Sequence, residues 1–350
     1  MKRPRRLKIE DWAYRRPIFN LQSSILVLVP LCLLLTACRS TPEVTKIGLI
    51  APFEGLSRRA GYTALAAMRG ALEDAGATEM AILPLALDDG DNPARARRSA
   101  RKLLADPAVV AVIGPLTPWT AAGAASVLEE SPHWITPFAI TPEAGFVDPR
   151  MTNAWADAWV AQVAQAVRRA GQERLVLAGW RLGWPDRSAA QWAEIAGMPV
   201  ALADNPDAVQ GGDAVVWLGS AADGAAYLAE LRAAQPTTPF WMGAQGGDPV
   251  FLERICPGSN RTECQRTSGV LDFAYWTSWT PIEYNPAIAP NFPGAPDAQL
   301  VYLATRVALH RITADSSPDS SLESIPGSAN WQLQIFEFSS GESVPAPVEK

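Results

Sequence analysis

The sequence predicts an α/β protein with two doubly wound units, each a parallel β-sheet that helices cover on both faces. Short apolar runs alternate with helical patterns, and the alternation restarts after a break near residues 147–153. A chain of 350 residues is also too long for one domain of ordinary size and suits two. Strand–helix alternation favours parallel sheets, because each helix carries the chain back to begin the next strand in the same direction.

The first unit holds four short apolar strand candidates with helical patterns between them. The helix after the first strand places Leu65, Met68 and Leu72 on one face, which we expect to be buried. Expected strands are 46–50, 81–87, 109–113 and 133–136, and expected helices are 61–75, 93–104 and 120–130. Five basic residues of helix 93–104 are interpreted as a solvated surface.

The second unit repeats this pattern and then changes character after residue 269. Residues 271–282 are rich in aromatic side chains, 281–296 are rich in proline, and 315–328 are polar. The proline-rich stretch is interpreted as an extended crossing segment. Expected helices are 154–170, 223–234 and 296–310, and expected strands are 174–178, 214–218, 240–242 and 331–338.

The N-terminus is typical of an export signal. A basic stretch precedes an apolar run at 25–35, which is shorter than the roughly 20 residues that span a bilayer. The run ends in Leu35-Thr36-Ala37-Cys38, which resembles the lipobox of bacterial lipoproteins. We therefore expect residues 1–37 to be a lipoprotein signal peptide, Cys38 to be lipidated and 38–45 to be a tether. An uncleaved anchor helix and a plain signal peptide with a chance cysteine are the alternatives.

Two cysteines remain in the body of the chain, Cys256 and Cys264, close together in a polar stretch. An oxidising compartment favours a disulfide between them, and two free thiols are the alternative. No other cysteine or histidine lies nearby in the sequence, so we expect no metal site there.

Charge and motif content exclude several functions. The chain has a net charge of −6, and because residues 1–37 carry seven basic and two acidic side chains, the remainder is at −11. An acidic body repels phosphate backbones, so no nucleic-acid partner is expected. A secreted hydrolase would need a positioned nucleophile and base, but the chain has two histidines, His133 and His310, and no Gly-x-Ser-x-Gly motif. We expect neither enzymatic activity nor a cofactor.

The ordered pieces of the chain resemble the type I periplasmic binding proteins, in the branch that binds leucine, isoleucine and valine. The resemblance spans residues 44–340, and it depends on the order and spacing of several short motifs. These are the first strand and loop 46–55, Asp88–Asp91 with Asn92-Pro93, 110–115, 135–137, 141–143, 239–247, and helix 296–309 with Tyr302.

This resemblance implies two lobes joined by three crossovers, with residues 46–147 and 273–315 in lobe 1 and residues 148–272 and 329–341 in lobe 2. It also implies a small-molecule ligand held between closing lobes, and delivery to the permease subunits of an ABC transporter. The carboxyl ends of parallel strands and clefts between domains are favoured binding sites on general grounds. Transport of amino acids is what the resemblance implies. Export and anchoring to a membrane by lipid, facing the periplasm or cell exterior, are expected from the N-terminal signal and Cys38.

The expected ligand-binding residues lie on loops at the carboxyl ends of the strands. They are Thr117, Trp119, Thr120, Phe138, Thr141, Trp184 and Gln245, with Trp276 as a further candidate. Thr120 and Thr141 are alternatively helix caps without ligand contact. The resemblance places Gln245 where the family has an acidic residue that binds the ligand's ammonium group, and it places bulky Phe138 where a small residue is expected.

These departures leave the ligand open between an amino acid-like compound and an apolar or aromatic carboxylate or amide. A neutral amide cannot offset a buried ammonium charge, and aromatic walls suit apolar or planar molecules. A ligand-sensing or protein-binding envelope lipoprotein of the same fold, without a transport role, is the alternative function, because segment 179–212 is short for the family's second lobe.

Overall fold

The computed structural model describes residues 44–77, 81–129, 131, 133–150, 152–179, 182–258, 269–281, 296–314, 331–339 and 342–345. The expected signal peptide, Cys38 and most of the expected tether lie outside these residues, as do Cys264, most of the proline-rich stretch and the polar stretch 315–328. Within the described part of the chain, no helix combines the length and the apolar character needed to cross a membrane.

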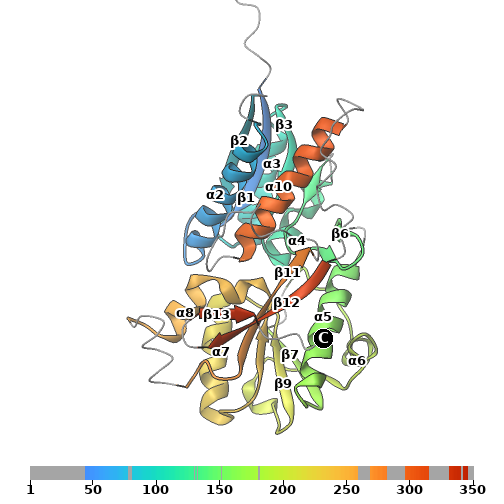
Figure 1. Ribbon diagram of the computed structural model, residues 1–350, viewed down its shortest axis with the longest axis vertical. Helices are drawn as coiled ribbons and strands as arrows, with labels where there is room; N and C mark the ends of the chain where they lie inside the picture. Colours follow the sequence, from blue (N-terminus) through green and yellow to red (C-terminus); the bar gives the residue numbers. More distant parts are fainter. Residues whose placement is uncertain are drawn as a thin grey trace, which may run out of the picture. The chain divides into compact units, whose positions relative to one another are not determined.

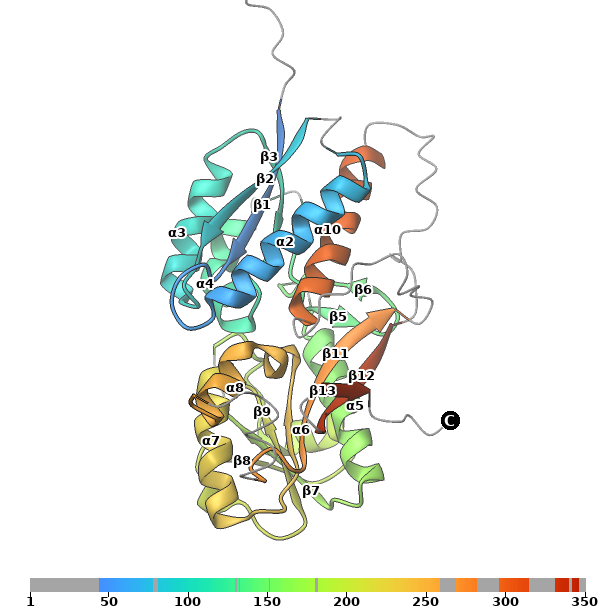
Figure 2. The same cartoon turned by 60° about the vertical axis from the view of Figure 1, so that its left-hand side comes forward.

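The first sheet has four parallel strands in the order β2-β1-β3-β4. Helices α2 and α10 lie side by side although they are far apart in the sequence, as both views show (Figures 1 and 2). We call this sheet with its helices the first lobe. Its elements are β1 Thr45–Ala51, α2 Arg58–Asp74, β2 Ile82–Asp88, α3 Pro93–Leu104, β3 Val109–Ile113, α4 Pro118–Leu128, β4 Trp134–Ile135 and α10 Pro296–Ala314.

Both faces of the first sheet are buried, as expected for a doubly wound unit. Ile47 and Leu49 of β1 pack in the same cluster as Met68 of α2 and Val301 of α10. Ile50, on the opposite face, packs in the cluster that contains Leu103 of α3 and residues of α4. Successive strand residues point to opposite faces, so burial of both faces explains why residues 47–51 of β1 include no polar side chain.

The second sheet has seven strands in the order β13-β12-β11-β10-β9-β7-β8. Strands β8, β7, β9, β10 and β11 are parallel, whereas β12 pairs with β11 and β13 with β12 in antiparallel register. We call this sheet with its helices the second lobe. Its strands are β7 Arg174–Ala178, β8 Val200–Leu202, β9 Asp213–Trp217, β10 Phe240–Met242, β11 Ala274–Pro281, β12 Trp331–Ser339 and β13 Glu342–Pro345.

Helices cover both faces of the second sheet as well. Leu175 and Leu177 of β7 pack in the cluster that contains Val163 of α5, and Val176 packs with Leu228 of α7 on the opposite face. The second lobe is therefore also doubly wound, although its far edge is antiparallel. Its helices are α5 Ala154–Arg169, α6 Ala189–Ala196, α7 Ala221–Ala234 and α8 Pro249–Ile255, with short 3₁₀ turns η1 Pro206–Ala208 and η2 Ala244–Gly247.

The structure differs from the sequence expectation at the aromatic-rich stretch. We expected the chain to return to the first lobe at residue 273, but β11 continues the second sheet, with Ala274 paired to Phe240 of β10. The part of the chain that packs on the first lobe is α10, which contacts α2. The side chains of β11 are buried on both of its faces, so its sequence carries no alternation that would reveal a strand. The wider division into lobe segments remains a prediction.

Several short elements were not predicted. Helix α6 begins with a capping box in which Ser188 accepts a hydrogen bond from the Gln191 backbone, a recognisable signal in the sequence. Strands β5 Ile140–Thr141 and β6 Gly145–Phe146 form a separate two-stranded antiparallel sheet. In the sequence they lie between β4 of the first sheet and β7 of the second.

Cys256 follows α8 and is disulfide-bonded. Because Cys264 lies outside the described residues, the pairing of these two cysteines stays a prediction.

Candidate functional site

A cavity lies where elements of both lobes meet, with about 650 Å³ of space that atoms do not fill, part of it open to solvent. The first lobe contributes the start of α4, the loop after β4 and Leu300 of α10. The second lobe contributes α5, the loop before α6, the ends of β9 and β10, and β11. The strand ends are carboxyl ends, which is where open α/β sheets commonly bind ligands.

Five of the expected site residues border this cavity: Thr117, Trp119, Phe138, Trp184 and Gln245. The structure thus brings them together from separate loops of both lobes. Their role as ligand contacts stays a prediction.

Thr120 and Thr141 do not border the cavity, and the expectation that they cap helices is wrong. Helix α4 begins at Pro118, because proline suits the first helical position, so Thr120 lies inside the helix and its hydroxyl donates to Thr117 O at 3.1 Å. Thr141 lies on β5 and is followed by a turn, where its hydroxyl accepts a hydrogen bond from Ala144 N at 3.2 Å.

Three tryptophans that the sequence reasoning missed also border the cavity: Trp155 and Trp159 on α5, and Trp279 on β11. Trp155 and Trp159 are four residues apart, which places them on one face of the helix, and that spacing was available in the sequence. Trp276 was the wrong candidate on β11, because it points into the core of the second lobe and stacks on Phe336 with ring centroids 3.9 Å apart.

The aromatic rings form one continuous wall. The Phe138 ring lies 5.0 Å from that of Trp155, and the Trp184 ring lies 5.0 Å from Trp155 and 5.5 Å from Trp159, measured between centroids. Trp184 Nε1 donates to Leu218 O at 3.1 Å, and Trp159 Nε1 donates to Thr277 Oγ1 at 3.0 Å. These hydrogen bonds fix both indoles, so the wall is formed before any ligand arrives.

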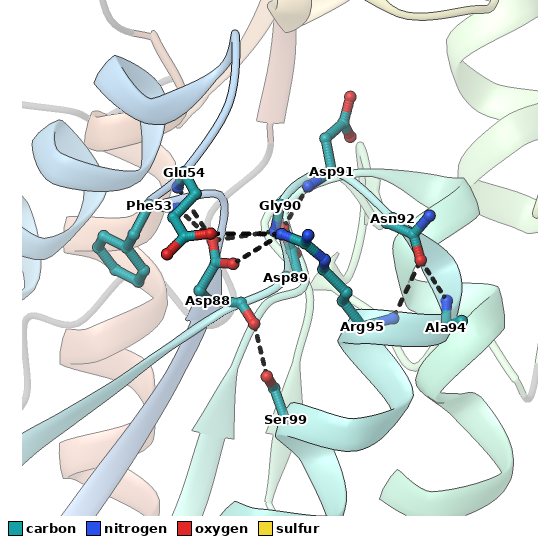
Figure 3. A network of polar contacts seen from close by, with 10 residues as sticks. All are labelled: Phe53, Glu54, Asp88, Asp89, Gly90, Asp91, Asn92, Ala94, Arg95 and Ser99. Atoms are coloured by element: carbon teal, nitrogen blue, oxygen red, sulfur yellow. Dashed lines mark hydrogen bonds and ion pairs between the residues drawn. The ribbon is translucent and has the colours of Figure 1, made fainter.

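Trp119 is held by the loop between β2 and α3. Figure 3 shows the polar contacts of this loop, without Trp119. Trp119 Nε1 donates to Asp91 Oδ1 at 2.8 Å, and Asp91 has a positive φ of 55°. The backbone N–H of Asp91 in turn donates to Asp89 Oδ1 at 2.9 Å. A non-glycine residue rarely adopts this backbone conformation, so the Asp89 contact supports the geometry that presents Asp91 to the indole.

The same loop is tied to the loop after β1. Asp88 Oδ1 accepts hydrogen bonds from Phe53 N at 2.8 Å and from Glu54 N and Gly90 N at 3.0 Å each (Figure 3). Asn92 caps α3 by accepting from Ala94 N and Arg95 N, as the Asn-Pro pair in the sequence indicated.

Asp89 is the one member of this loop that is almost wholly buried, at 1% exposure. Its Oδ2 has no hydrogen-bond partner. Burial raises the pKa of Asp89 to about 7, and the neighbouring Asp91 and Asp88 carboxylates add to that effect against the hydrogen bond from Asp91 N. In the described part of the chain, no group of three or more His, Cys, Asp or Glu side chains could hold a metal ion.

Gln245 is the one side-chain amide among the described residues that border the cavity, and its Nε2 donates to Gly219 O at 3.4 Å. No Asp, Glu, Lys or Arg is found among the described residues that border the space. The described lining of the cavity is therefore apolar and aromatic, with hydrogen-bonding groups but no ionised ones.

The two lobes touch at the rim of the cavity. Gly183, next to Trp184, has a φ of +97°, and a Cβ atom there would lie 2.1 Å from Pro118 O at the start of α4. Away from the cavity, Arg59 of α2 forms an ion pair with Glu253 of α8. Any side chain at position 183 would hold the first and second lobes apart at this point.

Comparison with known proteins agrees with this geometry. The model of a family described as periplasmic binding proteins matches residues 44–253, more than half of the chain. The chain belongs to the periplasmic binding protein family. No curated protein matches the sequence.

Solved structures of binding proteins share the fold. A possible leucine/isoleucine/valine-binding protein from Rhodopirellula baltica is 14% identical, with a TM-score of 0.61, over 87% of this chain and 96% of that one. A leucine-binding protein from Thermotoga maritima is 17% identical, with a TM-score of 0.59, over 87% and 98%. A branched-chain amino acid transporter substrate-binding protein from Streptococcus pneumoniae, solved with isoleucine, is 14% identical, with a TM-score of 0.57, over 87% and 100%.

These comparisons confirm the resemblance that the sequence indicated and its type I periplasmic binding protein fold. At such low identity, the solved structures establish the fold alone. The class of ligand has to be inferred from the residues that border the cavity.

Proposed function

We propose that this periplasmic binding protein is an exported solute-binding lipoprotein that captures a small molecule between its two lobes for an ABC-type importer of amino acids or related compounds. The observation that carries the proposal is an aromatic cavity bordered by residues of both lobes, with no charged side chain among the described residues that line it. A molecule that contacts both lobes favours the closed arrangement, because it gains contacts there that the open one lacks.

Delivery to ABC permease subunits is supported by the family and by the described roles of the proteins with the same fold. The Streptococcus pneumoniae protein is a transporter's substrate-binding protein, and the Thermotoga maritima protein binds leucine. Neither histidine of the chain is among the described residues that border the cavity.

Export and lipid anchoring at Cys38 are supported by the sequence preceding that cysteine. The disulfide at Cys256 suits an oxidising compartment. The membrane contact in this proposal is the lipid on Cys38, with residues 38–45 as the tether to β1.

The experiment that tests ligand capture is native mass spectrometry of gently purified protein, followed by identification of any small molecule released on denaturation. A matched pair of variants separates the cavity from the rest of the fold. Ala244→Phe fills the cavity that Ala244 borders, whereas Ala233→Phe adds the same ring on the exposed face of α7.

We expect a stoichiometric ligand on the wild type and on Ala233→Phe, and none on Ala244→Phe. A wild type that carries no small molecule and instead retains a cell-envelope protein would contradict solute capture and favour a protein-binding role.

A further inference from the structure

We propose that the cavity takes an uncharged molecule with an apolar or aromatic body and a carbonyl-type hydrogen-bond acceptor, and that it excludes molecules with an ammonium group. This inference rests on the proposed capture of a small molecule between the lobes. It departs from the zwitterionic amino acids that the proteins of similar fold bind, and it depends on which polar groups of the cavity are still free.

Two indole N–H groups remain free at the cavity. Trp155 and Trp279 are 3% and 4% exposed, yet neither Nε1–H has an acceptor in the described part of the chain, and both nitrogens remain open to solvent. The hydroxyl of Ser278, also at the cavity, has no partner there either. A ligand that fills the cavity displaces water from these donors, and a donor left without a partner in a filled cavity is costly. The groups therefore favour a ligand that brings an acceptor to them.

The other indoles of the wall offer no such donor. Trp119, Trp159 and Trp184 donate their Nε1–H groups to protein oxygens at 2.8, 3.0 and 3.1 Å. They contribute rings alone, and the rings pack at tilted or edge-on angles against one another. The wall therefore provides apolar surface, and the free donors on α5 and β11 provide the polar contact.

Nothing that borders the cavity among the described residues can neutralise an ammonium group. Gln245 is uncharged, and the Thr277 hydroxyl is already used, since it accepts from Trp159 and donates to Met242 O at 3.1 Å. The carboxylate of Asp91 lies behind Trp119 and accepts from it. An ammonium ion moved from water into such a space loses its hydration without gaining a counter-ion, which is strongly unfavourable.

Four probes of one shape test the inference by thermal shift and calorimetry: 3-phenylpropanamide, 3-phenylpropionate, phenylethylamine and phenylalanine. We expect 3-phenylpropanamide to bind most tightly, and the two probes with an ammonium group to bind at least about 100-fold more weakly. Tetramethylammonium is the fifth probe, because an aromatic wall could hold a cation by its ring faces. Binding of phenylalanine, phenylethylamine or tetramethylammonium as tight as that of the amide would overturn the inference.

Variants locate the effect. Trp155→Phe and Trp279→Phe keep an aromatic ring and remove one free donor each. Each substitution should therefore lower the affinity for 3-phenylpropanamide by roughly 2- to 10-fold. Trp276→Phe is the matched control outside the cavity and should leave affinity unchanged. Gln245→Glu places a carboxylate at the cavity and should raise the affinity for phenylethylamine. Equal affinities in Trp155→Phe, Trp279→Phe and the control would contradict the assignment of the donors.

The molecule that copurifies with the protein separates this inference from the proposed function. If it contains an amine that is protonated at neutral pH, solute capture stands and the ligand class is wrong. If it is an uncharged carbonyl compound, solute capture and the proposed ligand class both stand, even if none of the probes binds. If no small molecule is found on the protein and none of the probes binds, both fall together.

Discussion

Replacing the buried Asp89 by asparagine should stabilise the protein at high pH and leave it unchanged at low pH. Burial raises the pKa of Asp89 from 3.8 to about 7, so the folded state holds a proton that the unfolded chain releases over that interval. The sign follows from linkage: the folded state binds more protons between pH 4 and 7, so the free energy of unfolding falls as the pH rises through that range. The whole shift corresponds to about 4 kcal/mol at most.

Between pH 5 and pH 8, the linkage relation gives a loss of about 2–3 kcal/mol from this one group. Asparagine can still accept from Asp91 N and carries no charge, so the Asp89→Asn variant should lose that pH dependence. It should match the wild type below about pH 3, exceed it by roughly 2 kcal/mol at pH 5, and exceed it by about 4 kcal/mol at pH 8. The measurement is urea-induced unfolding at several pH values.

Asp186→Asn makes the same chemical change at an exposed site and serves as the control. Parallel curves for the wild type and Asp89→Asn, with a constant offset from pH 5 to pH 8, would refute the argument that Asp89 is buried with a raised pKa.

Two further predictions concern anchoring and the contact between the lobes. Cys38→Ser should release the protein from the membrane fraction or stall its processing. Cys32→Ser, in the apolar run, is the control and should do neither. A mature, membrane-bound Cys38→Ser protein would contradict the lipoprotein proposal. Gly183→Val should weaken binding of the copurified ligand at least about 10-fold, because the new side chain meets Pro118 O, whereas Gly171→Val, at φ +81° with nothing within 4 Å, should leave affinity unchanged.

Regular elements with strong apolar patterns could be predicted from the sequence. Strands 109–113, 174–178 and 240–242 and helix 93–104 have the predicted bounds, since each is flanked by turn or cap residues. The Asn92-Pro93 pair, for example, fixed where α3 begins because an asparagine cap and a proline at the first helical position act together. The antiparallel edge of the second sheet could not be predicted, because pairing of β12 with β11 depends on residues far apart in the chain.

The site was predicted in part, because only its loop residues follow from the order of strands and helices. Loops at the carboxyl ends of strands place Thr117, Phe138 and Gln245 at one cavity, which topology alone implies. Trp155 lies in the first turn of helix α5, and Trp279 lies on a strand whose side chains are buried on both faces. Neither residue is on a loop that follows a parallel strand, so a search of such loops does not find them. Choosing Trp276 in place of Trp279 on β11 was an error of strand facing, which a short aromatic stretch without polar alternation does not reveal.

The loop from Asp88 to Asp91 connects the stability of the first lobe to the shape of the cavity. Asp89 is held where its charge is unfavourable, and yet its Oδ1 is the acceptor that supports Asp91 at a positive φ. Asp91 in turn fixes the indole of Trp119 at the cavity. Strained backbone and buried ionisable groups persist where the surrounding structure requires them, and they gather at functional sites. A stabilised Asp89→Asn protein that binds its ligand unchanged would mean that the hydrogen bond to Asp91 N is what the site needs, and that the charge itself is dispensable.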